Sequence, residues 1–330
     1  MLSAAAALVG VLALGVAALA AWLGYAQWRT AQTETRSRQE AAPAGGRWLR
    51  AFDTDIHVRE WGLPTARPLL LVHGTGAWAG TWVSNADALA SAGFRVVAMD
   101  LPPFGFSVPP ASRDYSREAQ ARRIQAVMAQ LGGQVTLVGH SFGGGPAAEA
   151  AMREPARVEH LVLVDAAIGL QPDAAPPCEG GGVAGAVLGW RGLRTALVSA
   201  AGTEPAFSGF WLSQFVARKE AVTPQRTAIY QQPFAARGFS QGLGDWAHQF
   251  ATGCEVPASV RPESFRALRI PVSLLWGADD SITPLAQAQR LKSLLPRAQL
   301  KVLPGVGHIP QIEDVAQFNA AAVMAVVNPP

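Results

Sequence analysis

The stretch VTLVGHSFGGGPAAEAAMREP, residues 135–155, decides the fold. It opens with a short β-branched run, which is typical of a strand buried on both faces, and it closes with an Ala-rich helical pattern. Between them lies a G-x-S-x-G motif, Gly139 to Gly143. A Ser on such a tight strand-to-helix turn projects its hydroxyl, and the helix N-terminus adds partial positive charge beside it. The sequence therefore predicts that Ser141 is a nucleophile.

The chain around this motif alternates short apolar runs with helical patterns. Such alternation predicts a mostly parallel α/β sheet with right-handed crossovers. The predicted strands are 48–52, 56–61, 68–72, 94–99, 135–138, 161–164, 272–276 and 300–303, with the first two as a hairpin. The predicted helices are roughly 81–92, 115–131, 142–153, 285–295 and 314–327.

One region interrupts the alternation. From about 168 to 265 no clear β run occurs, and ten aromatic residues are spread between Trp190 and Phe250. This pattern predicts a helical insertion placed over the sheet, whose aromatics mostly form its own core. We expect a few of them to face a ligand, with Trp211, Phe210 and Trp190 as the candidates for substrate binding.

Two further motifs supply partners for a nucleophilic Ser. Asp279 and Asp280 follow the strand that ends at Trp276, and an Asp at the carboxyl end of a parallel strand can accept a hydrogen bond from an imidazole. We favour Asp280, with Asp279 as the alternative because adjacent Asp residues also form turns. His308 closes a Gly-rich loop after the last strand and is the predicted general base.

The segment His73-Gly74-Thr75-Gly76 follows another apolar strand. A backbone N–H here, that of Thr75, could form an oxyanion hole together with the N–H of Phe142. Losing one such donor typically costs about 3–4 kcal/mol of transition-state stabilisation. Taken alone, this motif is equally compatible with an ordinary Gly-rich turn.

The order of these motifs resembles the α/β-hydrolase superfamily over roughly residues 47–328. The matching stretches are HGTG at 73–76, DLPPFGFS at 100–107, GHSFGG at 139–144, WGADD at 276–280 and GVGHIPQIE at 305–313. The resemblance implies an eight-stranded, mostly parallel sheet flanked by helices, with a helical cap between the sixth and seventh strands. It also implies a catalytic triad of Ser141, Asp280 and His308 that needs no metal and no organic cofactor.

Details of the motifs narrow the activity. Ser141 stands where dehalogenases and epoxide hydrolases of this fold carry Asp, which argues against those activities. Serine-dependent carbon–carbon hydrolases resemble the chain near HGTG, but they often carry Trp where Ile309 stands. We therefore expect a carboxylic-ester hydrolase of the esterase or lipase type acting on a small apolar substrate. The alternatives are a carbon–carbon bond hydrolase, a cofactor-free haloperoxidase or perhydrolase, and a non-catalytic accessory or binding protein on the same fold.

The N-terminus is apolar enough to cross a membrane. No charged side chain occurs before Arg29, and about 20 helical residues span a hydrocarbon core of about 30 Å. A cleaved signal peptide is the alternative, but the basic residues that usually precede its apolar core are missing. We expect a membrane segment at 1–28, a polar tether at 29–46 and a hydrolase domain at 47–330. The basic residues after the segment favour a cytoplasmic domain under the positive-inside rule, and we leave the membrane side open.

Composition excludes several classes of partner. The chain is 49% hydrophobic and 15% charged with a net charge of +3, and no basic run is interleaved with aromatics, so we expect no nucleic-acid binding. The two cysteines, Cys178 and Cys254, form no C-x-x-C motif and have no His cluster beside them, which argues against a zinc site. They are either one disulfide, which would favour an oxidising compartment, or two thiols.

Overall fold

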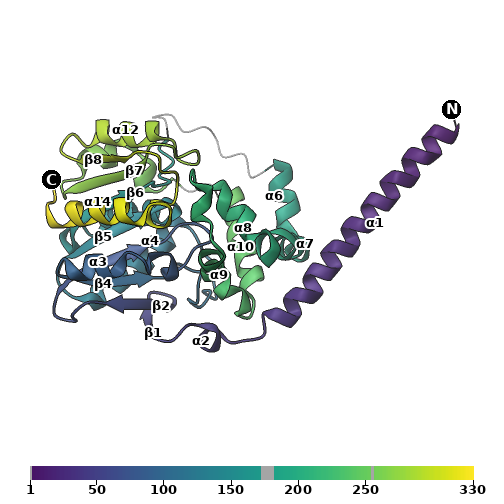
Figure 1. Cartoon of the computed structure of the whole chain (residues 1–330), viewed down its shortest axis with the longest axis horizontal. Coiled ribbons are helices and arrows are strands. Elements are labelled where there is room, and N and C mark those ends of the chain that lie inside the picture. The colour runs from purple at the N-terminus through teal and green to yellow at the C-terminus, as the bar shows by residue number, and fades with distance from the viewer. Residues whose placement is uncertain (1, 172–181, 254–255) are drawn as a thin grey trace.

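A computed structural model describes residues 2–171, 182–253 and 256–330 (Figure 1). Within these residues the chain builds one sheet of eight strands. The strands are β1 (Gly46–Ala51), β2 (Thr54–Trp61), β3 (Arg67–Val72), β4 (Phe94–Met99), β5 (Val135–His140), β6 (Val158–Val164), β7 (Val272–Gly277) and β8 (Gln299–Leu303). Each predicted strand has a counterpart, and the boundaries differ by a few residues.

The sheet has the order β1-β2-β4-β3-β5-β6-β7-β8. The β1–β2 and β2–β4 pairs are antiparallel, and all later pairs are parallel. Strand β5 is buried at every position because both of its faces are covered by helices, which explains its continuous apolar run. This architecture confirms the predicted α/β-hydrolase fold.

Helices cover both faces of the sheet (Figure 1). One face is covered by α3 (Ala86–Ser91) and α14 (Val315–Val327), and the other by α4 (Arg117–Leu131), α5 (Gly144–Arg153) and α12 (Leu285–Leu294). The small residues of α5 let it lie close to the sheet, since a Cβ on Gly144 would come within 2.4 Å of the Cβ of Ala166. The N-terminus of α5 is thereby fixed against the carboxyl ends of the parallel strands.

The region between β6 and β7 is a helical insertion, as the sequence predicts. Its described residues contain no strand. The helices are α6 (Gly182–Gly189), α7 (Arg191–Leu197), α8 (Pro205–Gln214), α9 (Pro224–Gln231), α10 (Phe239–Thr252) and α11 (Pro262–Ala267). Phe265 of α11 belongs to the core under the sheet, so the insertion proper ends before that helix. Cys178 and Cys254 lie outside the described residues, and their pairing stays a prediction.

The N-terminal helix α1 (Leu2–Thr33) leaves the body of the molecule at its C-terminal end (Figure 1). By length and composition, Ala6–Thr33 is the one helix of the described chain that could cross a membrane. The segment 29–46, expected as a polar tether, is more structured than a linker. It includes the end of α1 and the short α2 (Arg38–Ala41), and the buried Arg38 guanidinium donates to the carbonyls of Gly105 and Ser107 at 2.9 and 3.0 Å.

Candidate active site

Ser141 lies on the sharp turn between β5 and α5. Its φ is +49°, a left-handed conformation that is strained for a residue with a side chain. The turn is possible because its neighbours lack side chains: a Cβ on Gly143 would lie 2.4 Å from the carbonyl oxygen of His73, and one on Gly139 would lie 2.8 Å from the Cα of Gly144. The strain and the glycines together project the Ser141 hydroxyl beyond the end of the strand.

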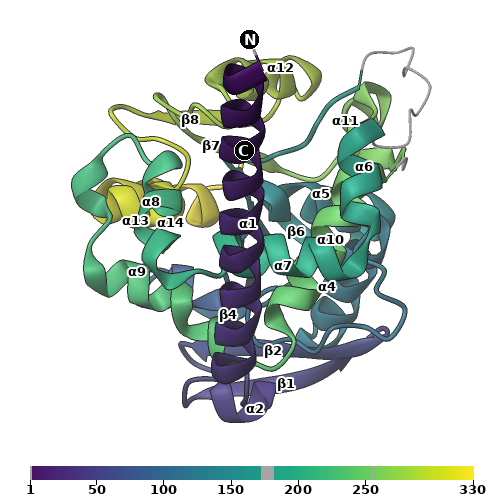
Figure 2. The same cartoon turned by 90° about the vertical axis from the view of Figure 1, so that its right-hand side faces the viewer.

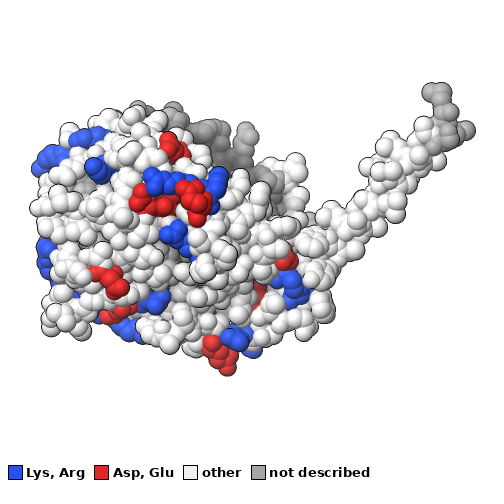
Figure 3. Space-filling model, in the orientation of Figure 1, with Lys and Arg blue, Asp and Glu red and all other residues white. Residues whose placement is uncertain are grey.

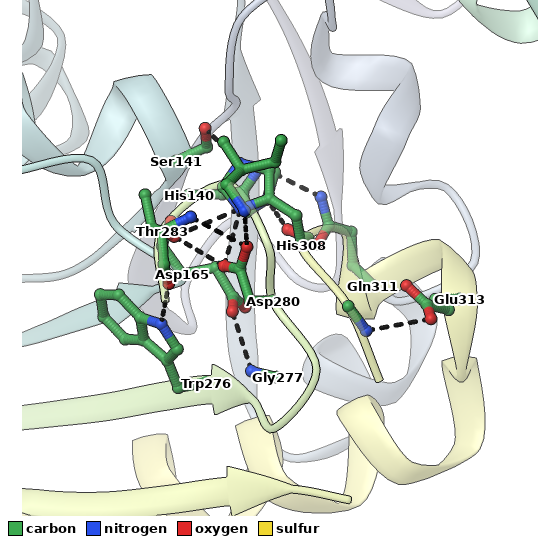
Figure 4. Close-up of polar contacts among 12 residues, drawn as sticks. His140, Ser141, Asp165, Trp276, Gly277, Asp280, Thr283, His308, Gln311 and Glu313 are labelled. Carbon is green, nitrogen blue, oxygen red and sulfur yellow. Dashed lines mark hydrogen bonds and ion pairs between the residues drawn. The ribbon is translucent and has the colours of Figure 1, made fainter. Parts of the chain in front are cut away.

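The structure brings Ser141, His308 and Asp280 together in one hydrogen-bonded row (Figure 4). Ser141 Oγ lies 2.8 Å from His308 Nε2, and His308 Nδ1 lies 2.8 Å from Asp280 Oδ2. All three side chains are buried, although they come from loops after three different strands. A neutral imidazole that donates from Nδ1 to Asp280 has Nε2 available to accept the Ser141 proton.

The two adjacent acids of the WGADD motif lie in different environments. Asp280 is buried, whereas Asp279 is exposed and its backbone N–H donates to Val306 O at 2.9 Å. Burial raises the pKa of Asp280, but its hydrogen bond and electrostatic attraction to His308, with the hydrogen bond from Thr283, outweigh this and hold the pKa at about 2. The Thr283 hydroxyl also donates to Oδ2, at 2.6 Å. Asp280 is therefore a carboxylate at neutral pH, and it is the acid that His308 contacts.

A second ring of polar contacts holds the loop that carries His308. The His140 ring is neutral because burial lowers its pKa to about 3, and its Nε2 donates to His308 O at 2.8 Å. Glu313 Oε1 accepts from the N–H of Gly307 at 2.9 Å and from those of Ala217 and Arg218 at 2.8 Å each. The His308 loop is thus tied both to the nucleophile turn and to the insertion.

Asp165, at the end of β6, is a member of the site that our sequence reasoning missed. Its Oδ1 accepts from Gly277 N–H at 2.8 Å (Figure 4). Its carboxyl is also in hydrogen-bonding contact with that of Asp280. Burial, with the charge of Asp280, raises its pKa well above the ordinary value, which favours the protonated form that can donate to Asp280. Its position directly after an apolar strand, like that of Asp280, is the signal that could have found it.

The ligand atoms of Asp165, Asp280 and His308 lie within 4.8 Å of one another, which makes them the one group among the described residues that could hold a metal ion. These atoms are already engaged, since Asp280 Oδ2 accepts from His308 Nδ1 and from the Thr283 hydroxyl. The hydrogen-bonding geometry therefore accounts for the cluster without an ion.

A cavity of about 750 Å³ opens beside Ser141 and His308. Thr75 and Phe142, the predicted oxyanion-hole residues, both line it. Of the three predicted substrate-binding aromatics, Trp211 lines the cavity. Phe210 and Trp190 do not, and both are largely exposed on the insertion. The sequence could not separate these cases because an outward-facing and an inward-facing aromatic share the same helical pattern.

The fold and the arrangement of Ser141, His308 and Asp280 are those of a serine hydrolase. The chain belongs to the family described as alpha/beta hydrolase fold, whose model matches residues 67–315. It is 30% identical over 266 residues to a 2-hydroxymuconate semialdehyde hydrolase of Pseudomonas sp. (strain CF600), covering 76% of this chain and 83% of the relative.

Two further comparisons extend this result. A 2-hydroxy-6-oxononadienedioate/2-hydroxy-6-oxononatrienedioate hydrolase of Burkholderia vietnamiensis is 28% identical over 274 residues, 80% of this chain and 88% of the relative. The crystal structure of a membrane phospholipase A, 24% identical, matches with a TM-score of 0.65 over 97% of this chain and 98% of that chain. With 97% of the chain covered, the likeness of fold extends into α1.

Proposed function

We propose that this chain is a serine hydrolase in which Ser141 forms an acyl-enzyme with a largely apolar carbonyl substrate. The observation that carries the proposal is the unbroken row from Ser141 Oγ through His308 to Asp280, with 2.8 Å at both steps. A non-catalytic protein on this fold would have no need of a buried, strained Ser aligned with an imidazole.

The reaction follows from the roles of these groups. His308 Nε2 takes the Ser141 proton as Oγ attacks the carbonyl, and Asp280 stabilises the imidazolium that forms. The N–H groups of Thr75 and Phe142 stabilise the oxyanion. The tetrahedral intermediate then breaks the bond to the leaving group, which takes the proton from His308, and water hydrolyses the acyl-Ser141 with His308 again as base.

For the bond that is cleaved, the first candidate is a carbon–carbon bond next to a ketone. The curated relatives are named as hydrolases of a hydroxymuconate semialdehyde and of oxo-dienedioates. In such a vinylogous diketone the carbon leaving group departs as a stabilised enolate and is protonated, and hydrolysis of the acyl-Ser141 yields a carboxylic acid. These relatives favour this candidate over the ester hydrolase that the motifs alone predict.

The second candidate, ester cleavage, is favoured by the charge of the cavity. A dienedioate carries two carboxylates, which a binding site normally meets with Arg or Lys. Among the described residues that line this cavity, Arg117 is the one permanent cation. Its guanidinium already donates to Ile168 O at 2.9 Å and to Ser259 Oγ at 3.2 Å. A neutral ester would need no further positive charge. We infer that the helical insertion acts as the cap over either substrate.

The test separates the chemistry from the substrate. A fluorophosphonate should label Ser141 in the full chain, and Ser141→Ala should abolish the labelling and all turnover. A panel that compares kcat/KM for neutral esters of rising chain length with that for vinylogous diketones, with and without carboxylates, assigns the bond. Turnover that persists in Ser141→Ala would refute the assignment of the nucleophile.

A further inference from the structure

The insertion presents an unusual number of large apolar side chains to its surroundings. Val183 is 82% exposed, Trp190 72% and Phe250 69%. Other apolar residues of α6 and α8 are exposed as well, and we call the whole set the apolar face. It consists of Val183, Val187, Trp190, Phe207, Phe210, Trp211 and Phe250. A soluble protein rarely leaves such a set exposed to water, so we expect a partner or a membrane to cover the apolar face.

The charges along this part of the insertion are all paired. The segment 182–214 has three charged residues, Arg191, Arg194 and Glu204. Arg191 bonds to Asp245 at 3.0 Å, and Arg194 also binds that carboxylate. Glu204 pairs with Arg29 of α1 at 3.0 Å. Each of these charges has a partner, but Arg191 and Arg194 share one carboxylate, so a net positive charge remains, which suits the headgroup level of a bilayer rather than its hydrocarbon core.

The apolar face lies beside the part of α1 that runs from Trp22 to Arg29. Figure 2 shows α6 and α8 on either side of α1, and Figure 1 shows both at the end of the molecule from which α1 departs. Contacts fix the level: the ring of Trp22 lies 6.3 Å from that of Phe207, and the Arg29 guanidinium donates to Ser199 O at 2.9 Å. On the N-terminal side of Arg29, α1 carries no charged residue, and Figure 3 shows its protruding part without acidic or basic side chains.

This level matches the edge of a lipid bilayer. The 22 residues from Leu2 to Leu23 extend roughly 33 Å at 1.5 Å per residue, close to a hydrocarbon core of about 30 Å. Trp22, Tyr25 and Trp28 lie at the end of this stretch, as aromatic residues do at a membrane interface. The ring centroids of Trp22 and Tyr25 are 5.8 Å apart, and those of Tyr25 and Trp28 are 5.9 Å apart. If α1 spans the membrane, the apolar face comes to rest at the headgroup level.

We propose that the apolar face docks on the same lipid bilayer that α1 crosses, and that the substrate enters the Ser141 cavity from that bilayer. The second part rests on the proposed function. Trp211 and Phe250 belong to the face and also line the cavity, so the cavity opens where the face meets lipid. The substrate class is then a neutral, membrane-soluble carbonyl compound, in keeping with a cavity that offers little charge.

Docking is tested without any substrate, using Trp190 as the probe. The full chain is reconstituted in phosphatidylcholine vesicles whose acyl chains are either plain or brominated near the headgroup. The Trp190 emission is obtained as the difference between the wild type and Trp190→Phe. We expect bromine to quench at least about half of this emission. The matched control is the difference for Trp61→Phe. Trp61 ends β2 beside the start of β4, so it lies at the end of the strands away from the insertion and should stay unquenched.

Trp190 emission that is equal in both kinds of vesicle overturns the docking, and cross-linking then shows whether a second copy of the chain covers the face instead. Finding that the mature protein lacks α1 would also overturn the proposed docking. These results are independent of catalysis.

Entry from the bilayer is tested by the rate at which fluorophosphonates label Ser141 in the same vesicles. One probe has a long alkyl chain and resides in the bilayer, and the other is short and water-soluble. Val183→Glu with Val187→Glu puts two charges on the face outside the cavity lining. We expect labelling by the long-chain probe to slow at least 10-fold and labelling by the short probe to change less than 2-fold.

The matched control for this pair is Leu63→Glu with Met324→Glu, two exposed apolar positions outside the insertion, which should leave both rates unchanged. Equal slowing of both probes overturns entry from the bilayer. If neither probe labels the wild type, the proposed function itself fails.

Discussion

Replacing Asp280 by Asn should disable the site while leaving its loop folded. Asp280 Oδ1 accepts from the N–H groups of Ile282 and Thr283 at 2.7 and 2.9 Å, and an Asn carbonyl can keep both bonds. The loss falls on Oδ2, which accepts from His308 Nδ1 at 2.8 Å. An amide NH₂ at that position forces Nδ1 to become the acceptor. The proton then moves to Nε2, where it blocks proton transfer from Ser141.

The expected loss follows from this tautomer exchange. In a serine-protease triad the same change lowers kcat by about 10⁴-fold, and the local geometry here has the same three bonded groups. We therefore expect a loss of about 10³–10⁴-fold, equivalent to about 4–5.5 kcal/mol of barrier. Because both backbone bonds to Oδ1 survive, the free energy of unfolding should fall by no more than about 1–2 kcal/mol.

The rate at which a water-soluble fluorophosphonate labels Ser141 measures this loss without knowledge of the natural substrate. Asp279→Asn is the matched control, because it makes the same chemical change one residue away at an exposed position. It should label within about 2-fold of the wild type. The reasoning is refuted if Asp279→Asn loses as much reactivity as Asp280→Asn, or if Asp280→Asn stays near the wild-type rate.

Three other changes test the surroundings of the site. Asp165→Asn keeps a donor toward Asp280 and should lower the labelling rate by less than about 10-fold. Asp165→Leu leaves buried partners unpaired and should lower the urea-unfolding free energy by about 1–3 kcal/mol. An equal fall in the unfolding free energy of both variants would contradict a protonated Asp165. Gly143→Ala should yield little folded protein in circular dichroism, since its Cβ would lie 2.4 Å from the backbone oxygen of His73, and a normal melting curve would contradict this. Burial lowers the pKa of His160 to about 4 from an ordinary 6.5, so the folded state resists protonation of this ring more than the unfolded state does. The folded state is therefore fully stable above pH 6.5 and loses free energy of unfolding as the pH falls toward 4. Between pH 7 and 5 this loss amounts to about 2 kcal/mol. Urea titrations at the two pH values should show this loss in the wild type, and His160→Gln should lack this contribution.

Periodicity and turn chemistry were sufficient to predict the sheet. A strand such as β5, buried on both faces, requires an unbroken apolar run, and a turn as tight as that at Ser141 requires glycines. The same rules placed His308 and the Asp279–Asp280 pair in loops at one edge of the sheet. Choosing between the two acids needed the structure, because burial and a bond to His308 depend on how the loop folds.

The polar residues around the triad were harder to find. Glu313 binds three backbone N–H groups, two of which come from residues about 95 positions away in the insertion. Asp165 meets Asp280 although 115 residues separate them in sequence. Contacts of this range depend on how separate elements pack, and no local pattern encodes them. The failure at Phe210 and Trp190 has the same origin, since exposure of an aromatic depends on what stands opposite it.

The contacts of the insertion link the site to the apolar face. Residues 215–218 follow α8 directly, and they bond to the catalytic loop through Phe215 O, which accepts from His308 N–H at 2.9 Å, and through Glu313. The helix α8, which we propose rests on lipid, is therefore connected within one short segment to the loop that carries His308. Displacing α8 must stretch these bonds before it can open the cavity further. The insertion is thus constrained at both ends, by the surface on which we propose it docks and by the imidazole it helps to hold.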